Sequence, residues 1–195
     1  GGDRLKLLRI YQWGGFGFGN TTSFFYGCAN LKITAVDAPS MTSTTSFASA
    51  FRNCNILTTI PGINNWNMSL ITSLSNCFAF SLLAEDLGLW NVSAVTDMSA
   101  AFRGLSWNYN ISAWNTANVT NMTSMFNANG TFNQNISGWN TASVTNMTSM
   151  FNACLQFEQN IGAWNITALT NATTMFTSVT LTNANYNGLL AGWGA

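Results

Sequence analysis

Large apolar residues return along this chain with a period close to 25 residues, and stretches rich in Asn, Thr and Ser separate them. In the five clearest units a Phe follows twelve residues after a Trp, and the same offset joins Trp13 to Phe25 and Pro39 to Phe51. The five Trp residues are Trp66, Trp90, Trp114, Trp139 and Trp164, and the matching Phe residues are Phe78, Phe102, Phe126, Phe151 and Phe176. With the two weaker units at the start, the pattern predicts seven repeats.

Two of these units are nearly identical, since residues 114–126 read WNTANVTNMTSMF and residues 139–151 read WNTASVTNMTSMF. A period of this length lies in the leucine-rich-repeat range of roughly 20 to 29 residues, where each coil must stack on its neighbours to bury its apolar side. We therefore predict a leucine-rich-repeat-like solenoid of about seven coils of 24–27 residues, with units starting near residues 13, 39, 66, 90, 114, 139 and 164.

Each coil is predicted to contain one short helical turn and one short strand. Val119, Met122, Met125 and Phe126 follow a helical spacing, and Thr120 suits the N-cap of a short helix or 3₁₀ turn. The later stretch, residues 132–139, is interpreted as an extended segment whose copies pair in parallel, about 4.8 Å apart.

The two ends of the chain depart from the repeat. Residues 1–12 carry half of the basic side chains and are predicted to form an N-terminal cap segment, followed by the solenoid over residues 13–180. Residues 181–195 break the spacing and are predicted to cover the last coil, because repeat arrays need terminal caps. The chain begins at Gly1 without Met, and we expect it to be a fragment of a larger protein.

Charge is scarce, with six Lys and Arg against six Asp and Glu among 195 residues, and no His. A neutral chain lacks the clustered Lys and Arg that nucleic acids and anionic membranes require, and no apolar run is long enough to cross a bilayer. The absence of His, the commonest general base and metal ligand, disfavours catalysis and zinc binding. We therefore expect no enzymatic activity, no cofactor, no metal, no nucleic acid and no membrane span. After Gly104 the only charged residue is Glu158.

The repeated Trp and Phe residues are interpreted as the structural core, with stacking of the Trp row on carbohydrate as the alternative. The Asn after each of the five Trp residues is predicted to form a structural amide ladder. Cys28 and Cys54 fall in the same slot of adjacent coils, so a disulfide between them and buried free thiols both remain open, as does the redox state of Cys77 and Cys154. Asn-x-Ser/Thr sequences mark possible glycosylation sites, of which we single out Asn118, Asn135 and Asn146.

The pattern W-N-T-x-x-V-T-N-M-T-S-M-F followed by A-x-x-F-N-Q-N-I resembles the repeat of the BspA-like leucine-rich-repeat surface proteins, which also occurs in mycoplasma lipoproteins. The resemblance covers nearly the whole chain and implies a module of an exported or virion-associated protein with roles in adhesion or recognition. It assigns no catalytic residues. Similar repeats usually carry Asp where this chain has Asn135 and Asn160, which lowers the expectation of bound cations and favours self-association.

Two functions follow as hypotheses. The first is a non-enzymatic recognition or adhesion module at an extracellular, cell or virion surface, whose partner is a surface protein or polysaccharide. The alternative is a structural subunit or stalk of an extracellular filament or phage fibre, in which other subunits of the same assembly are the partners, because a net charge of zero favours association. Regular Thr rows suggest, more weakly, binding to ice or crystalline glycan.

Overall fold

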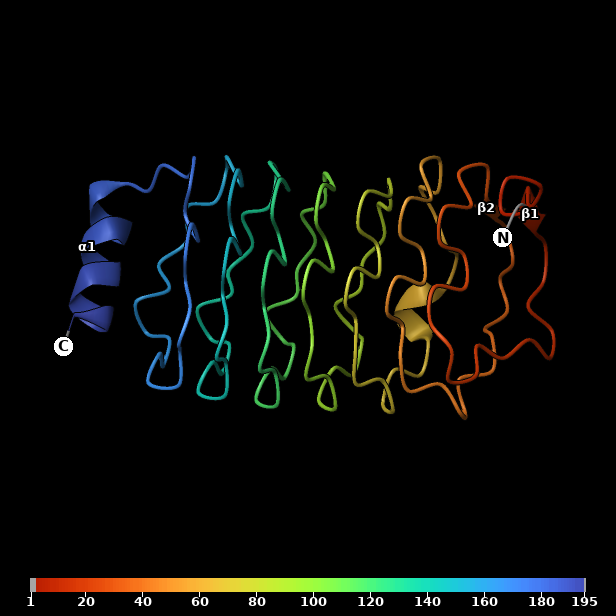
Figure 1. Cartoon of the computed structure of the whole chain (residues 1–195), viewed down its shortest axis with the longest axis horizontal. Helices are drawn as coiled ribbons and strands as arrows, with labels where there is room; N and C mark the ends of the chain where they lie inside the picture. The colour runs from red at the N-terminus through yellow and green to blue at the C-terminus, as the bar shows by residue number, and fades with distance from the viewer. Residues whose placement is uncertain (1–2, 195) are drawn as a thin grey trace.

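The computed structural model describes residues 3–194 and shows the chain winding into successive coils stacked along one long axis (Figure 1). The two ends of the chain lie at opposite ends of the stack. The regular elements are short: strands β1 (Arg9–Ile10) and β2 (Lys32–Ile33), the 3₁₀ helix η1 (Ile63–Asn65) and helix α1 (Asn183–Trp193). Turns and irregular backbone therefore make up most of each described coil.

Short parallel pairings link successive coils of the stack. β1 pairs with β2 so that Arg9 lies opposite Lys32, and Gly17 forms a single parallel bridge with Ser40. Further single bridges link the remaining coils in one continuous row, through Ser46, Ser73, Asp97, Asn121, Asn146 and Asn171. The paired positions are 23 to 27 residues apart, so each coil advances the stack by one rung.

The stretch after each bridge is a row of tight turns, and the helical turn predicted over residues 120–126 does not form. In this row the Met125 N–H donates to the Met122 carbonyl at 3.2 Å, while the Ser124 N–H donates to Thr148 of the next coil at 2.8 Å. Ser124 and Ala128 both have left-handed backbone, with φ of 55° and 57°. An α-helix or a continuous 3₁₀ helix needs negative φ throughout, so the left-handed residues restrict the i to i−3 bonds to separate single turns.

The parallel pairing also lies in a different part of the coil from the predicted one. The segment over residues 132–139 has no strand, and the bridges lie instead at Asn121 and Asn146, inside the V-T-N-M stretches. Alternate N–H groups of the turn row donate to the next coil, and the others close turns within their own coil. This division satisfies the backbone donors without a continuous strand.

The core is one apolar cluster that runs through the length of the stack. Phe rings from successive coils stack face to face along it, with centroid separations of 5.6 Å between Phe51 and Phe78 and 5.9 Å between Phe126 and Phe151. Because each ring contacts rings in both neighbouring coils, burial in one coil depends on the presence of the next.

Helix α1 lies across the C-terminal end of the stack (Figure 1). The Glu158 carboxylate accepts bonds from the Thr182 N–H at 2.8 Å and from the Asn185 side chain at 2.6 Å, and Thr182 is the N-cap of the helix. Gly188 and Gly192 face Gly162 so closely that a Cβ on Gly192 would meet the Gly162 carbonyl. The glycines thus allow the helix backbone to approach the last coil directly.

Candidate recognition surface

The repeat Trp and Phe residues lie in the interior of the stack. All five Trp side chains are only 3–4% exposed, and four of the five Phe side chains are buried, whereas Phe176 near the C-terminal end is partly exposed. Trp139 stacks between Trp114 and Trp164 with centroid separations of 6.4 Å on both sides. Burial on this scale leaves the Trp row no free ring face for a carbohydrate.

A second ladder joins the Trp residues to the backbone of the preceding coil. The indole N–H groups of Trp90, Trp114, Trp139 and Trp164 donate to carbonyls 27 or 28 residues earlier, at 2.7–3.1 Å. The buried indole N–H groups of Trp13 and Trp66 have no partner among the described residues. The indole ladder therefore begins at Trp90, which bonds the Ile63 carbonyl.

The four cysteines are buried free thiols, so the disulfide left open between Cys28 and Cys54 is not formed. The Cys54 thiol instead donates to the Phe25 carbonyl at 3.1 Å. Burial raises the pKa of the Cys54 thiol to about 12 and that of Cys154 to about 12. Thiols held in this way are unreactive small core residues rather than nucleophiles.

The Asn residues after the Trp row each close a turn in their own coil. The Asn115 side-chain oxygen accepts the Ala117 N–H at 3.2 Å, and the Asn140 oxygen accepts the Ala142 N–H at 3.1 Å. Asn135 does the same for Ser137 at 3.0 Å, as Asp86 does for Gly88 at 2.7 Å in an earlier coil. Asn therefore replaces Asp at this position without loss of the turn, because both side chains accept through an oxygen.

The three singled-out Asn-x-Ser/Thr residues differ in how free their amides are. Asn118 is exposed, but its amide nitrogen donates to the Ser93 carbonyl at 2.7 Å. Asn135 is exposed, and its oxygen accepts from Ser137. Asn146 is half-buried in the bridge row, with its oxygen accepting the Thr148 N–H at 2.9 Å. Asn135 is the most accessible of the three for a bulky modification.

An exposed Thr ladder runs beside the bridge row. From the second member onward each hydroxyl donates to the carbonyl of the Thr one coil earlier, at 2.9–3.2 Å, while the first donates to the Asn20 side chain at 3.1 Å. Its members are Thr45, Thr72, Thr96, Thr120, Thr145 and Thr170. This row is longer than the sequence patterns of Thr alone indicated, because the first three members precede the regular V-T-N-M repeats.

Most of the carboxylates accept hydrogen bonds from backbone N–H groups. The Asp37 carboxylate accepts the Trp13 N–H at 3.0 Å and the Gly14 N–H at 2.7 Å, and these bonds lower its pKa, the Trp13 bond most. The Thr182 N–H, followed by side-chain donors, likewise lowers the pKa of Glu158. Among residues 3–194 the one ion pair joins Lys6 to Asp3 at 2.7 Å. The arginines are therefore left without acidic partners in the described part of the chain.

Sequence reasoning missed a surface row of arginines and aromatic rings near the N-terminal half. We call Arg4, Tyr26, Arg52, Phe80 and Arg103 the arginine–aromatic row. The Arg52 guanidinium lies 5.6 Å from the centre of the Tyr26 ring, and that of Arg103 lies 5.3 Å from the centre of the Phe80 ring. The available signal was the residue directly after the repeat Phe, which is Tyr26, Arg52 and Arg103 in three of the first four coils.

Within residues 3–194 no group of three or more acidic, Cys or His side chains is placed to hold a metal ion. The helices of this part also lack the length and apolar character needed to cross a membrane.

Comparison with known proteins gives a family without an assigned activity. No curated protein and no solved structure matches the chain significantly. A family model described as "Mycoplasma protein of unknown function, DUF285" matches residues 19–105 and 79–189, which together extend over most of the stack and the start of α1. The repeated match agrees with the internal repetition of the sequence, and the chain belongs to this Mycoplasma-type DUF285 family.

Proposed function

We propose that this chain is a non-enzymatic recognition module, built as a solenoid like that of the BspA-like leucine-rich-repeat surface proteins and displayed on a cell or virion surface. The observation that carries the proposal is the set of exposed rows in which successive coils present side chains at equivalent positions. The Thr ladder from Thr45 to Thr170 is the longest of them. Such rows suit extended or repetitive ligands, because one contact is repeated at every rung.

Binding of the whole chain to surface components tests this proposal. The purified chain is immobilised and exposed to a panel of cell-surface polysaccharides and envelope proteins, with serum albumin as the control. We expect saturable binding to at least one member of the panel and none to albumin. Failure to bind every member of the panel would refute a recognition role.

A second function, assembly with other copies of this chain, is favoured by the N-terminal end of the stack. An open hollow of about 640 Å³ lies there, lined mainly by apolar residues that include Leu7, Tyr11 and Phe16. Tyr11 is 71% exposed, and the Trp13 indole N–H lies buried beside the hollow without a partner among residues 3–194. A second copy seated on this end would continue the coil-to-coil interface of the stack, and nothing in a net charge of zero opposes it.

Sedimentation over a hundredfold range of concentration distinguishes the two functions. Under the assembly hypothesis the average mass rises with concentration, and Tyr11→Ser abolishes the rise. Tyr186→Ser is the matched control, since Tyr186 is an exposed ring on α1 at the opposite end. A chain that stays monomeric throughout refutes assembly and leaves recognition as the function.

A further inference from the structure

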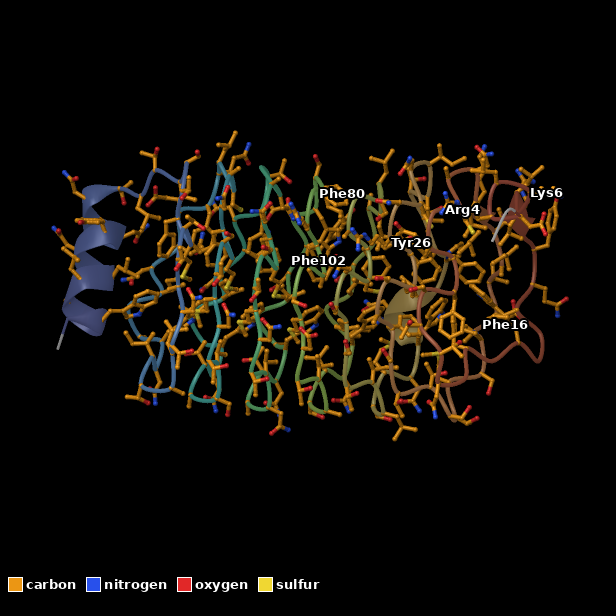
Figure 2. All side chains as sticks on the ribbon, in the orientation of Figure 1. Arg4, Lys6, Phe16, Tyr26, Phe80 and Phe102 are labelled. Atoms are coloured by element: carbon orange, nitrogen blue, oxygen red, sulfur yellow. The ribbon has the colours of Figure 1, made fainter. Side chains whose placement is uncertain are left out.

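We infer that the arginine–aromatic row is a binding site for a linear acidic polysaccharide, in which the guanidinium groups bind carboxylate or sulfate groups and the rings contact the sugars. This inference rests on the proposed recognition function and names the chemical class of its ligand. Figure 2 shows Arg4, Tyr26 and Phe80 following one another along the same side of the stack, in order from the N-terminal end.

Backbone bonds establish the register of the row. The Gly27 N–H donates to the Arg52 carbonyl at 2.8 Å, and the Phe80 N–H donates to the Arg103 carbonyl at 2.9 Å. The Asn53 N–H donates to the Ala79 carbonyl at 2.9 Å, so Ala79 takes the equivalent position on the third rung and Phe80 directly follows it. Tyr26, Arg52, Phe80 and Arg103 therefore lie on four successive rungs, with Arg4 on the segment before them. Arginines and aromatic rings alternate, and Arg52 and Arg103 are two rungs apart, which is about 10 Å at the spacing of parallel strands.

The ring contacts hold the arginines in place and leave their donors unused. Each of the two guanidinium groups leans over the ring of the preceding rung, a geometry that orients the group for paired bonds to a carboxylate or sulfate. Within residues 3–194 Arg4, Arg52 and Arg103 have no ion pair and donate no side-chain hydrogen bond. The Nε atom of Arg52 is buried without a partner.

Both aromatic rings remain partly exposed to solvent, and glycines make room for the Phe80 and Arg4 side chains. Tyr26 is 38% exposed and Phe80 is 41% exposed. The Phe80 ring lies against Gly104 so closely that a Cβ there would be 2.6 Å from its Cδ1 atom. Arg4 packs in the same way against Gly27, where a Cβ would be 3.2 Å from its Cδ atom. Apolar ring surface beside charged groups suits a sugar chain, whose ring faces are apolar and whose edges are polar.

The continuation of the row favours a polysaccharide over a nucleic acid. After Arg103 the equivalent positions are occupied by Asn127 and Asn152, which are linked to the row through the Gly104 N–H and the Ala128 N–H at 2.8 Å. Amides bind sugar hydroxyls but do not neutralise phosphates. A nucleic acid carries a phosphate at every nucleotide and depends on several cations for its affinity, which this surface lacks beyond Arg103. The length of one pyranose unit in an extended chain is close to the spacing between successive rungs. Because Arg52 and Arg103 are two rungs apart, their spacing matches a polysaccharide with an acidic group on every second sugar.

Binding of hyaluronan fragments to the whole chain tests the inference, because hyaluronan carries a carboxylate on every second sugar. The comparison polymers are neutral dextran and single-stranded oligothymidylate. The test variant is Arg52→Gln with Arg103→Gln. The matched control is Arg9→Gln with Lys32→Gln, which removes the same charge from the paired strands β1 and β2. A third variant, Gly104→Ala, displaces the Phe80 ring while every charge is retained.

We expect hyaluronan to bind and dextran not to bind. The double arginine variant should lose about tenfold or more in affinity, since each charged hydrogen bond contributes measurably to binding, and the control pair should stay within about twofold. Gly104→Ala should weaken binding at unchanged net charge. Equal losses in the test and control pairs, an unaffected test pair, or tighter binding to oligothymidylate would each overturn the inference. If hyaluronan fails while another surface component binds, the row assignment is wrong and the recognition function stands; if nothing binds, both fail.

Discussion

The indole N–H ladder predicts that the same substitution will have different effects in two buried positions. Trp139 and Trp66 are both 3% exposed, so Trp→Phe removes a similar ring volume from each. The Trp139 N–H donates to the Ile111 carbonyl at 3.1 Å, whereas the Trp66 N–H is buried without a partner among the described residues. Trp139→Phe therefore breaks a buried hydrogen bond, although the Ile111 carbonyl still accepts the Trp114 N–H at 3.1 Å, whereas Trp66→Phe removes an unsatisfied buried donor.

The difference is large enough to measure. Loss of a buried hydrogen bond costs about 1 kcal/mol, and an unsatisfied buried polar group costs about 1–3 kcal/mol. Trp139→Phe should therefore lower the free energy of unfolding by about 2 kcal/mol more than Trp66→Phe does. With a urea slope of about 2 kcal/mol per molar, the two midpoints should differ by about 1 M.

Urea unfolding followed by circular dichroism measures this difference, and the slopes should be unchanged. Trp114→Phe is the replicate, since its N–H donates to the Leu87 carbonyl at 3.1 Å, and it should behave like Trp139→Phe. The argument is refuted if Trp66→Phe lowers the midpoint as much as the other two variants. In that case ring packing alone would account for the Trp contribution.

Three further predictions concern the ends of the stack and the thiols. The lowered pKa of Glu158 means that its contribution to stability is present above the carboxyl's ordinary pKa and is lost as pH falls through the lowered value, so the protection factors of the α1 amides, corrected for the intrinsic pH dependence of exchange, should fall as pH drops below that ordinary pKa of about 4. Gly192→Ala places a methyl group against the Gly162 carbonyl and should detach α1, whereas Gly138→Ala, which meets nothing within 4 Å, should not; α1 amide exchange and thermal unfolding check both. Because burial raises the pKa of Cys54 to about 12, its native thiol should resist iodoacetamide at pH 8 and react once urea unfolds the chain; rapid labelling of the native chain would contradict this placement.

The repeat spacing predicted which residues share a rung, because that depends only on the length of one coil. Trp139 and Phe151 occupy the interior alongside their counterparts in adjacent coils, as the fixed offset between them indicated. The conformation within a coil could not be predicted in the same way. Ser124 and Ala128 adopt a left-handed backbone that their residue types disfavour, and hydrogen bonds to the next coil hold them there.

Helix α1 also could not be predicted from its local sequence, although in this case a helix forms where the sequence disfavours one. Its sequence contains Gly188 and Gly192 together with several Asn residues, all weak helix formers, so local preference does not indicate a helix. The helix depends on contacts outside itself: Thr182 caps its start, Glu158 holds that cap, and Gly162 receives the glycine face. The arginine–aromatic row could not be predicted for a related reason. Tyr26 and Arg52 become neighbours only when successive coils stack in the observed register.

The distribution of charge ties the fold to the proposed recognition role. Asp37 and Glu158 lie near opposite ends of the stack, where their carboxylates accept backbone N–H groups of neighbouring coils. These acids therefore act within the structure and do not offset the arginines. The guanidinium groups of Arg52 and Arg103 lie over aromatic rings, which carry no compensating negative charge, and neither group forms an ion pair within residues 3–194. A chain with a net charge of zero can in this way keep a positive row on its surface, because its carboxylates accept backbone N–H groups of their own or a neighbouring coil, or pair with Lys6, and do not pair with these arginines within residues 3–194.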